Sequence, residues 1–160
     1  MMKLLVVTAC GAKKALKPEM ARNLYRSSRI KAVYNMSSNN DMAILSSEYG
    51  LIDANKIIKP YDRIMDELRA KQLIPSIMKG IKNYDIIVFF KGGASKIYLT
   101  CIRKACEKAG KILVVFGFAN MGGINNLPRI TELLKDEKLQ EVLDMQESGI
   151  FVYKPKSVID

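Results

Sequence analysis

The chain has 160 residues, of which 49% are apolar and 26% charged, a balance that argues against intrinsic disorder, a collagen-like repeat or a membrane protein. Its mass of 18.0 kDa fits one domain of ordinary size, so we expect a single domain over residues 1–160. Histidine is absent, which excludes Ser-His-Asp triads, Cys-His nucleophile pairs and histidine-ligated zinc. Any catalysis must therefore use cysteine, lysine, tyrosine, serine, asparagine or carboxylate side chains.

Positive charge is concentrated at the start of the chain. The segment from Met1 to Lys31 holds eight basic residues and one acidic residue, which gives it +7 of the formal net charge of +10. If these side chains share a face, that face attracts phosphates and its binding weakens with salt. The alternative is a lysine-rich surface without a specific partner.

The sequence carries no sign of a membrane or secretory protein. No apolar run approaches the roughly 18 residues of a membrane span, and the apolar start from Met1 to Cys10 is too short for a signal peptide. We therefore expect a cytoplasmic protein without a membrane partner. The three cysteines, Cys10, Cys101 and Cys106, cannot all pair and lack a metal-knuckle spacing, so we expect free thiols, no metal site and no cofactor.

The first half of the chain alternates strand and helix patterns. A continuous apolar run rich in β-branched residues predicts a strand over 3–10 that is covered on both faces. Helical periodicity follows over 20–33, then a second strand run over 43–47. A longer helix is expected over 64–81, which Pro75 should kink or split.

The second half continues the alternation. Strands are expected over 86–90 and 112–116, with a helix over 97–109 between them that ends at Gly110. A fourth helix is expected over 127–145, with Pro128 in its first turn. A short edge strand over 150–154 would be a fifth strand.

These elements predict an α/β fold, a three-layer sandwich whose central, mainly parallel sheet has four and possibly five strands. Ligands in such sheets bind outside the carboxyl ends of the strands. The loops to consider therefore begin at Cys10, Ser46, Lys91 and Gly117.

The first loop places Cys10 at a strand end, followed by a glycine and by Lys13 and Lys14. The two cations and a helix N-terminus expected after them would favour the thiolate form of the cysteine or hold a phosphate. The alternative is a small buried cysteine that only ends the strand.

The second loop combines two hydroxyls, Ser46 and Ser47, with a carboxylate, Glu48, and a ring, Tyr49. Glu48 could transfer a proton and Tyr49 could stack on a planar ring. A plain turn with a packed tyrosine would have the same sequence. Tyr61 and Asp62 follow and are also candidates, although Asp62 could instead cap a helix beginning near Arg63.

The third and fourth loops are rich in glycine. Phosphate could be bound by Lys91, Gly92, Gly93 and Ser95, where a strand leads into a helix whose first amides are free. The glycine spacing fits neither a Walker loop nor the dinucleotide fingerprint, and a flexible turn with an ordinary N-cap is the alternative. In the fourth loop, Phe118 could stack on a base and Asn120 could read its edge, or the loop could be only a connection.

Short blocks in these loops carry a resemblance to a known family. They are Thr8 to Lys14 (TACGAKK), Asn23 to Tyr25 (NLY), Ile44 to Leu51 (ILSSEYGL) and Pro60 to Asp62 (PYD). With these blocks in this order, the chain resembles a prokaryotic family of unknown function (DUF6884). Members of that family carry a Cys-Gly-Lys-Lys loop, a Leu-Tyr pair, a Leu-Ser-Ala-x-Tyr-Gly-Leu segment and a Pro-Tyr-Asp triplet. The resemblance covers residues 4–100 and specifies no reaction.

The same blocks are more distantly similar to the catalytic region of archaeosine synthase, a tRNA-modifying enzyme. The spacing of Cys10 and Lys14 matches that region, but Ala15 and Leu16 follow where its motif continues with proline, tyrosine and then histidine. Addition of the lysine to a nitrile is therefore not expected here.

The expected sheet also resembles the uracil-DNA glycosylase architecture, in which the substrate base enters at the strand ends. This resemblance implies a group that positions water, a ring that stacks on the base and an amide that reads it. Asp62 or Glu48, Tyr49 or Phe118, and Asn120 could fill these places.

Together these observations predict an enzyme of the glycosylase or base-modification class, acting on a nucleobase, nucleotide or nucleic acid. Glu48, Asp62 and Cys10 are its candidate catalytic residues. A noncatalytic nucleotide or nucleic-acid binding module is the alternative, and a structural partner protein is a third interpretation.

Overall fold

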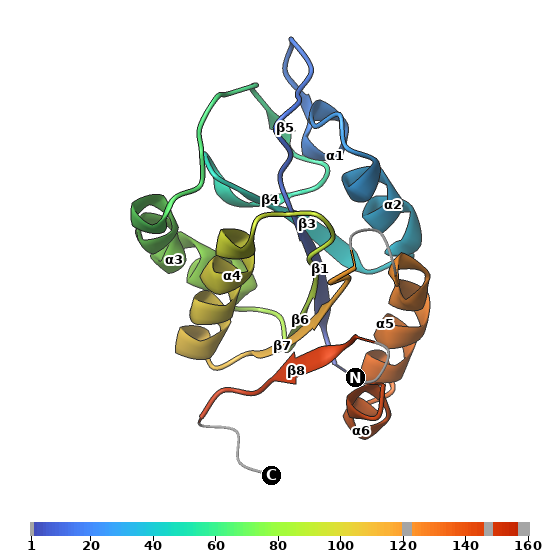
Figure 1. The fold of residues 1–160 in the computed structure, drawn as a ribbon. Helices are drawn as coiled ribbons and strands as arrows, with labels where there is room; N and C mark the ends of the chain where they lie inside the picture. Colours follow the sequence, from blue (N-terminus) through green and yellow to red (C-terminus); the bar gives the residue numbers. More distant parts are fainter. Residues whose placement is uncertain (1, 120–122, 146–148, 157–160) are drawn as a thin grey trace.

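The computed structural model describes residues 2–119, 123–145 and 149–156. Its centre is a six-stranded mixed sheet in the order β4-β3-β1-β6-β7-β8 (Figure 1). The four inner strands are parallel: β1 (Leu4–Ala9), β3 (Asp41–Ser46), β6 (Ile86–Phe90) and β7 (Ile112–Phe116). The edge strands β4 (Gly50–Asp53) and β8 (Phe151–Tyr153) are antiparallel to their neighbours. The predicted mainly parallel sheet is confirmed, whereas the expected count of four or five strands was too low.

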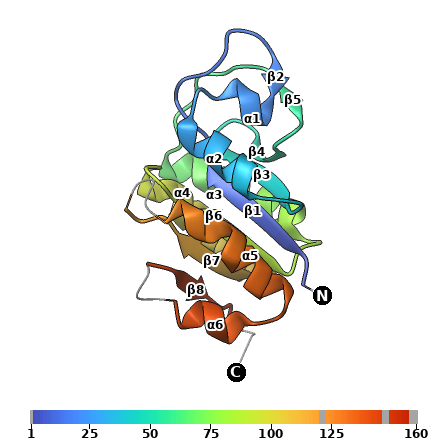
Figure 2. The ribbon, with the colours of Figure 1, turned by 90° about the vertical axis from the view of Figure 1, so that its right-hand side faces the viewer.

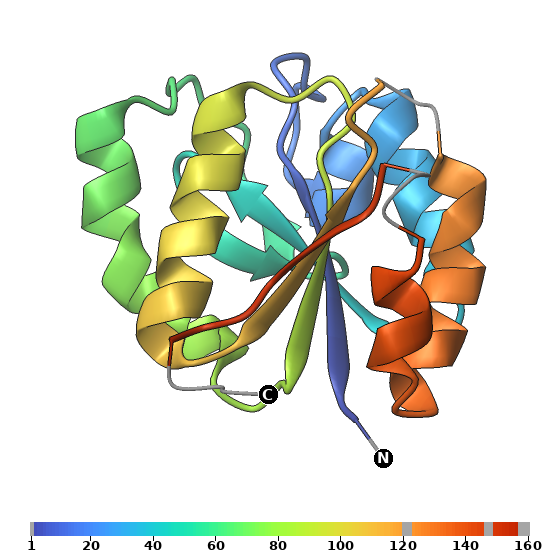
Figure 3. The same ribbon diagram turned by 60° about the horizontal axis from the view of Figure 1, so that its bottom comes forward.

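Helices cover both faces of this sheet (Figure 3). On one face lie α3 (Glu67–Ile81) and α4 (Lys96–Ala109). On the other lie α1 (Ala21–Leu24), α2 (Ser28–Met36), α5 (Leu127–Lys135) and α6 (Leu139–Leu143). None of the helices in the described ranges is long and apolar enough to cross a membrane.

The strand β1 shows how the sequence builds two cores. Its residues point alternately to the two faces of the sheet. Leu5 and Val7 pack in the core beneath α3 and α4, whereas Leu4 and Val6 pack in the core beneath α2 and α5. A strand buried on both faces must be apolar throughout, which is why its run predicted the centre of a sheet.

Two of the predicted helices are each divided in the structure. The helix expected over 20–33 becomes α1 and α2, because Tyr25 is extended (φ −80°, ψ 128°) and Ser27 caps a new helix by accepting a hydrogen bond from the Ile30 amide at 3.3 Å. The helix expected over 127–145 becomes α5 and α6, with Glu137 between them in the left-handed region at φ 59°. A short 3-10 helix, η1 (Ile124–Asn126), precedes α5.

The helix α3 begins later than predicted and continues through its proline. It begins at Glu67 because Asp66 is its N-cap, accepting a hydrogen bond from the Arg69 amide at 2.8 Å. Pro75 does not split it. Pro75 and Lys71 are both exposed, so water can satisfy the Lys71 carbonyl that the proline leaves without a partner.

Short antiparallel pairs escaped the sequence prediction. The segment after Ser46 is a hairpin turn into β4, where Gly50 adopts φ 75°. A separate two-stranded sheet pairs β2 (Glu19–Met20) with β5 (Ile57–Ile58) beyond the main sheet (Figure 2). Strands of two residues are too short to produce a recognisable alternation.

The strand order creates a crevice at the carboxyl ends of β1 and β6. These strands are neighbours, yet the chain leaves β1 toward α1 and α2 on one face and leaves β6 toward α4 on the other (Figure 1). The two connections therefore diverge, which is the place where open parallel sheets bind their ligands.

Candidate functional site

A pocket of about 420 Å³ lies at this divergence. Three stretches of chain contribute most of its lining: the loop after β1, the loop after β6 with the first turn of α4, and residues 62–65 before α3. Ser47 and Arg29 complete it. The predicted convergence of distant loops at one end of the sheet is therefore present for the first three loops.

Cys10 is buried at the strand end, where its thiol contacts two hydroxyls. Its Sγ lies 3.3 Å from the Tyr98 hydroxyl and 4.0 Å from Ser47 Oγ, to which the thiol donates. Burial raises the pKa of the Tyr98 phenol above its ordinary value, so this hydroxyl stays protonated and can donate to the sulfur. Ser47 in turn donates to the Arg63 carbonyl at 2.6 Å. The thiol is thus held at the pocket by contacts with two polar side chains.

Lys14 lies at the pocket with its ammonium above an aromatic ring. Its Nζ donates to the Ala12 carbonyl at 3.1 Å and stands 4.5 Å from the centroid of the Tyr61 ring. The helix N-terminus expected directly after this loop is absent, because Lys14 pairs with Tyr25 through an isolated antiparallel bridge. Lys13 does not line this pocket and faces a neighbouring groove.

A chain of hydrogen-bonded hydroxyls holds the aromatic ring that Lys14 contacts. The Tyr25 and Tyr61 hydroxyls lie 2.7 Å apart, and Ser46 Oγ donates to Tyr61 at 2.8 Å. Burial raises the pKa of Tyr25 to about 12 and also raises the pKa of Tyr61, so both phenols remain neutral. Ser46 also accepts the Tyr49 amide at 3.0 Å. These groups do not line the pocket, and they fix the turn and the ring on which Lys14 rests.

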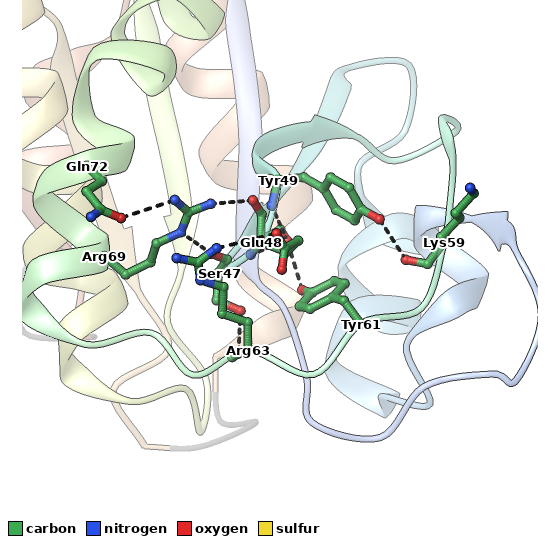
Figure 4. A network of polar contacts seen from close by, with 9 residues as sticks. Ser47, Glu48, Tyr49, Lys59, Tyr61, Arg63, Arg69 and Gln72 are labelled. Carbon is green, nitrogen blue, oxygen red and sulfur yellow. Dashed lines mark hydrogen bonds and ion pairs between the residues drawn. The ribbon is translucent and has the colours of Figure 1, made fainter.

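Glu48 and Tyr49 do not line the pocket, and Figure 4 shows the contacts that they make beside it. Glu48 Oε1 lies 3.5 Å from Arg63 Nη1, so this carboxylate contacts a pocket residue rather than the pocket itself. The Tyr49 hydroxyl donates to the Lys59 carbonyl at 3.0 Å. Arg69 holds the same turn by donating to the carbonyls of Ser47 at 2.7 Å and Glu48 at 2.5 Å.

Asp62 does line the pocket, and it is exposed. The alternative that it caps a helix is wrong, because Asp66 is the N-cap of α3. Among the described residues its carboxylate has neither a hydrogen-bond donor nor a cation within ion-pair distance. It is therefore available to a ligand.

The lysine of the loop after β6 does not line the pocket. Lys91 turns back on this loop, and its Nζ donates to the carbonyls of Ala94 at 3.0 Å and Gly92 at 3.4 Å. Gly93 and Ser95 line the pocket. Ser95 is the N-cap residue of α4, but its side chain makes no capping hydrogen bond. The first-turn amides of α4 therefore lack a side-chain acceptor.

Arg29, Arg63 and Tyr98 line the pocket and were not among the sequence candidates. Arg29 Nη2 donates to the carbonyls of Ala9 at 2.8 Å and Cys10 at 3.0 Å, while its buried Nε has no partner among the described residues. Burial lowers the pKa of this guanidinium. No local signal separates Arg29 from the other basic residues nearby. Tyr98 could have been found, because a side chain one turn into α4 leans toward the helix N-terminus and so toward the loop.

The fourth loop contributes nothing described to this pocket. Phe118 is exposed and its ring lies 5.1 Å from that of Phe151, centroid to centroid. Asn120 lies outside the described residues. Among those that are described, no three histidine, cysteine, aspartate or glutamate side chains gather in a way that could hold a metal ion.

A family model described as a family of unknown function (DUF6884) matches residues 5–112, which is more than half of the chain. The chain belongs to the DUF6884 family. Every residue that lines the pocket falls within the range matched by DUF6884. No curated protein and no solved structure matches the chain.

Proposed function

We propose that this DUF6884 protein is an enzyme that acts on the base or the glycosidic bond of a nucleotide unit bound in the pocket beside Cys10. The observation that carries the proposal is the meeting of a buried thiol, an available carboxylate and several cations at the divergence of β1 and β6. Each comes from a different segment: Cys10 from the end of β1, Asp62 from the approach to α3, and Arg29 from α2.

The size and charge of the pocket support a nucleotide. A volume of about 420 Å³ falls within the range of roughly 300–1,000 Å³ typical of small-molecule sites. Its lining holds three cationic side chains, Lys14, Arg29 and Arg63, against the one carboxylate of Asp62. An anion gains from this excess of positive charge and from the amides of Lys96 and Ile97 in the first turn of α4, which have no acceptor among the described residues.

The chemical roles follow from the surroundings of each group. The Asp62 carboxylate would position a water molecule or take its proton, because it has no other partner. Cys10 would contact the reacting base, with the Tyr98 hydroxyl donating to its sulfur. Glu48, a candidate catalytic residue from the sequence, would act indirectly, as a positioning residue that pairs with Arg63.

The architecture gives further, weaker support. A mainly parallel sheet with helices on both faces and a site at its strand ends agrees with a uracil-DNA glycosylase-like arrangement. The glycosylase and base-modification classes are therefore the reactions to test first.

One observation favours a noncatalytic binding module instead. No hydrogen bond among the described residues fixes the Asp62 carboxylate in one position, whereas catalytic groups are normally held by their neighbours. In a module of this kind, the same cations would bind phosphate and Asp62 would have no role.

Two variants distinguish the enzyme from the module. The ligand is a nucleotide or oligonucleotide that shifts the melting temperature of the protein. Asp62→Asn should bind it with an affinity within about threefold of the natural protein. Product formation should fall at least about 100-fold, the lower end of the range for general acid–base catalysis. Cys10→Ser should also lose turnover and retain the fold. Unchanged turnover in both variants would refute the proposed roles, and binding without product in the natural protein would favour the module.

A further inference from the structure

A second hollow adjoins the pocket and is more strongly basic. This groove, of about 380 Å³, lies between the loop after β1 and the start of α2. Its charged side chains are Lys13, Arg26 and Arg29, and no carboxylate lines it. The groove and the pocket share Gly11, Ala12, Arg29 and Gly93, so the two lie side by side.

The backbone holds the two sides of the groove together. The Arg26 amide donates to the Lys13 carbonyl at 2.8 Å. This hydrogen bond keeps the two residues side by side. Both side chains are exposed, and neither belongs to an ion pair among the described residues. Their charges are therefore not neutralised within the described part of the chain.

The groove also has hydrogen-bond donors suited to a phosphate. Ser28 is exposed at the first position of α2, where amides lack intrahelical partners. Ser27 satisfies only the Ile30 amide of that turn. Arg29 stands between the groove and the pocket, anchored through its contacts with the Ala9 and Cys10 carbonyls.

We propose that the substrate is a single-stranded polynucleotide, with one nucleotide in the pocket and the phosphate backbone of its neighbours in the basic groove. This inference rests on the proposed function and narrows its substrate class. A free nucleotide would fill the pocket and leave the groove empty, whereas a strand needs a cationic track that continues from the base site. A base paired within a duplex could not enter the pocket without leaving the stack.

The chain offers a matched control on its opposite flank. A pocket of about 410 Å³ between α3 and α4 also carries lysines, among them Lys71 and Lys104, but it does not share a lining residue with the proposed site. Removing two charges there changes the net charge as much as removing two from the groove. Any difference between the two double variants therefore reports position rather than total charge.

The experiment is a fluorescence-anisotropy titration of the full chain with a labelled single-stranded oligonucleotide of about twelve nucleotides over a salt series. Lys13→Gln/Arg26→Gln should weaken binding about tenfold and reduce the slope of log affinity against log salt by about 1.4, the value for two lost phosphate contacts. Lys71→Gln/Lys104→Gln should leave both unchanged. Affinity for nucleoside 5′-monophosphates should be the same in all three proteins.

Each other outcome has a definite meaning. Equal weakening by both double variants, or an oligonucleotide that binds no tighter than a mononucleotide, would overturn the strand proposal and leave the proposed function intact. Tighter binding of polyglutamate than of the oligonucleotide would overturn it in favour of an acidic protein partner. If neither mononucleotides nor oligonucleotides bind, the proposed function itself fails.

Discussion

Gly92 has no functional group, yet it controls the space that Arg29 occupies. It adopts φ 52°, in the left-handed region, and an added Cβ would lie 2.5 Å from Arg29 Cδ. Both the backbone angle and the contact require glycine here. The position of a pocket cation thus depends on a glycine that does not itself line the pocket.

Gly92→Ala should lower the free energy of unfolding by about 1–3 kcal/mol, because the left-handed backbone and the clash with Arg29 both penalise the methyl group. Chemical denaturation measures this change. Gly11→Ala is the control, since its Cβ would meet only Ser27 Cβ at an ordinary 3.6 Å. Equal stability of the two variants would contradict the close packing of Gly92 against Arg29.

Residue type alone did not distinguish the two candidate carboxylates. Glu48 and Asp62 both lie in polar loops near the same strand ends, and the structure separates them by their partners. Glu48 contacts Arg63, whereas Asp62 lines the pocket without an ion pair. This difference depends on where α3 begins.

The start of α3 determines which aspartate caps it and which remains at the pocket. Apolar periodicity indicated a helix from residue 64, but Ile64 is exposed and the helix begins only at Glu67. Periodicity identifies the face of a helix more reliably than its ends. The segment 62–65 consequently has no regular secondary structure and borders the pocket.

Asp66→Ala should lower the free energy of unfolding by about 1 kcal/mol, because the Arg69 amide loses its capping acceptor. Asp62→Ala should change it by less than about 0.5 kcal/mol, as expected for an exposed residue outside any helix. Thermal or urea unfolding of both variants tests the pair. The reverse order would mean that Asp62 caps the helix and is not available for chemistry.

The strands of the main sheet were predicted better than the helices. The four inner strands are continuous apolar runs because helices cover both of their faces, and such runs are visible in the sequence. In the segments 20–33 and 127–145, the apolar face continues although the helix is interrupted. An apolar pattern continues across such a break, so it could not reveal the turn at Tyr25 or at Glu137.

For the whole molecule, the decisive feature is the order of strands in the sheet. The sequence predicted that distant loops meet at one end, but it could not state that β1 and β6 are neighbours. This adjacency brings Cys10 beside Tyr98, although 88 residues separate them. Sheet order depends on long-range pairing and leaves no local pattern. The sequence could therefore place Tyr98 near the loop after β6, but it could not show that Tyr98 contacts Cys10 or that Arg29 lines both the pocket and the groove.

The most direct test of the account is an amide chemical-shift titration of the isotope-labelled full chain with nucleoside 5′-monophosphates. We expect saturable shifts concentrated at Gly11, Ser47, Gly93 and Ser95, the pocket residues from three separate segments. Shifts concentrated instead at Lys71 and Thr100, in the pocket between α3 and α4, would contradict the account, as would the absence of any shift at millimolar ligand.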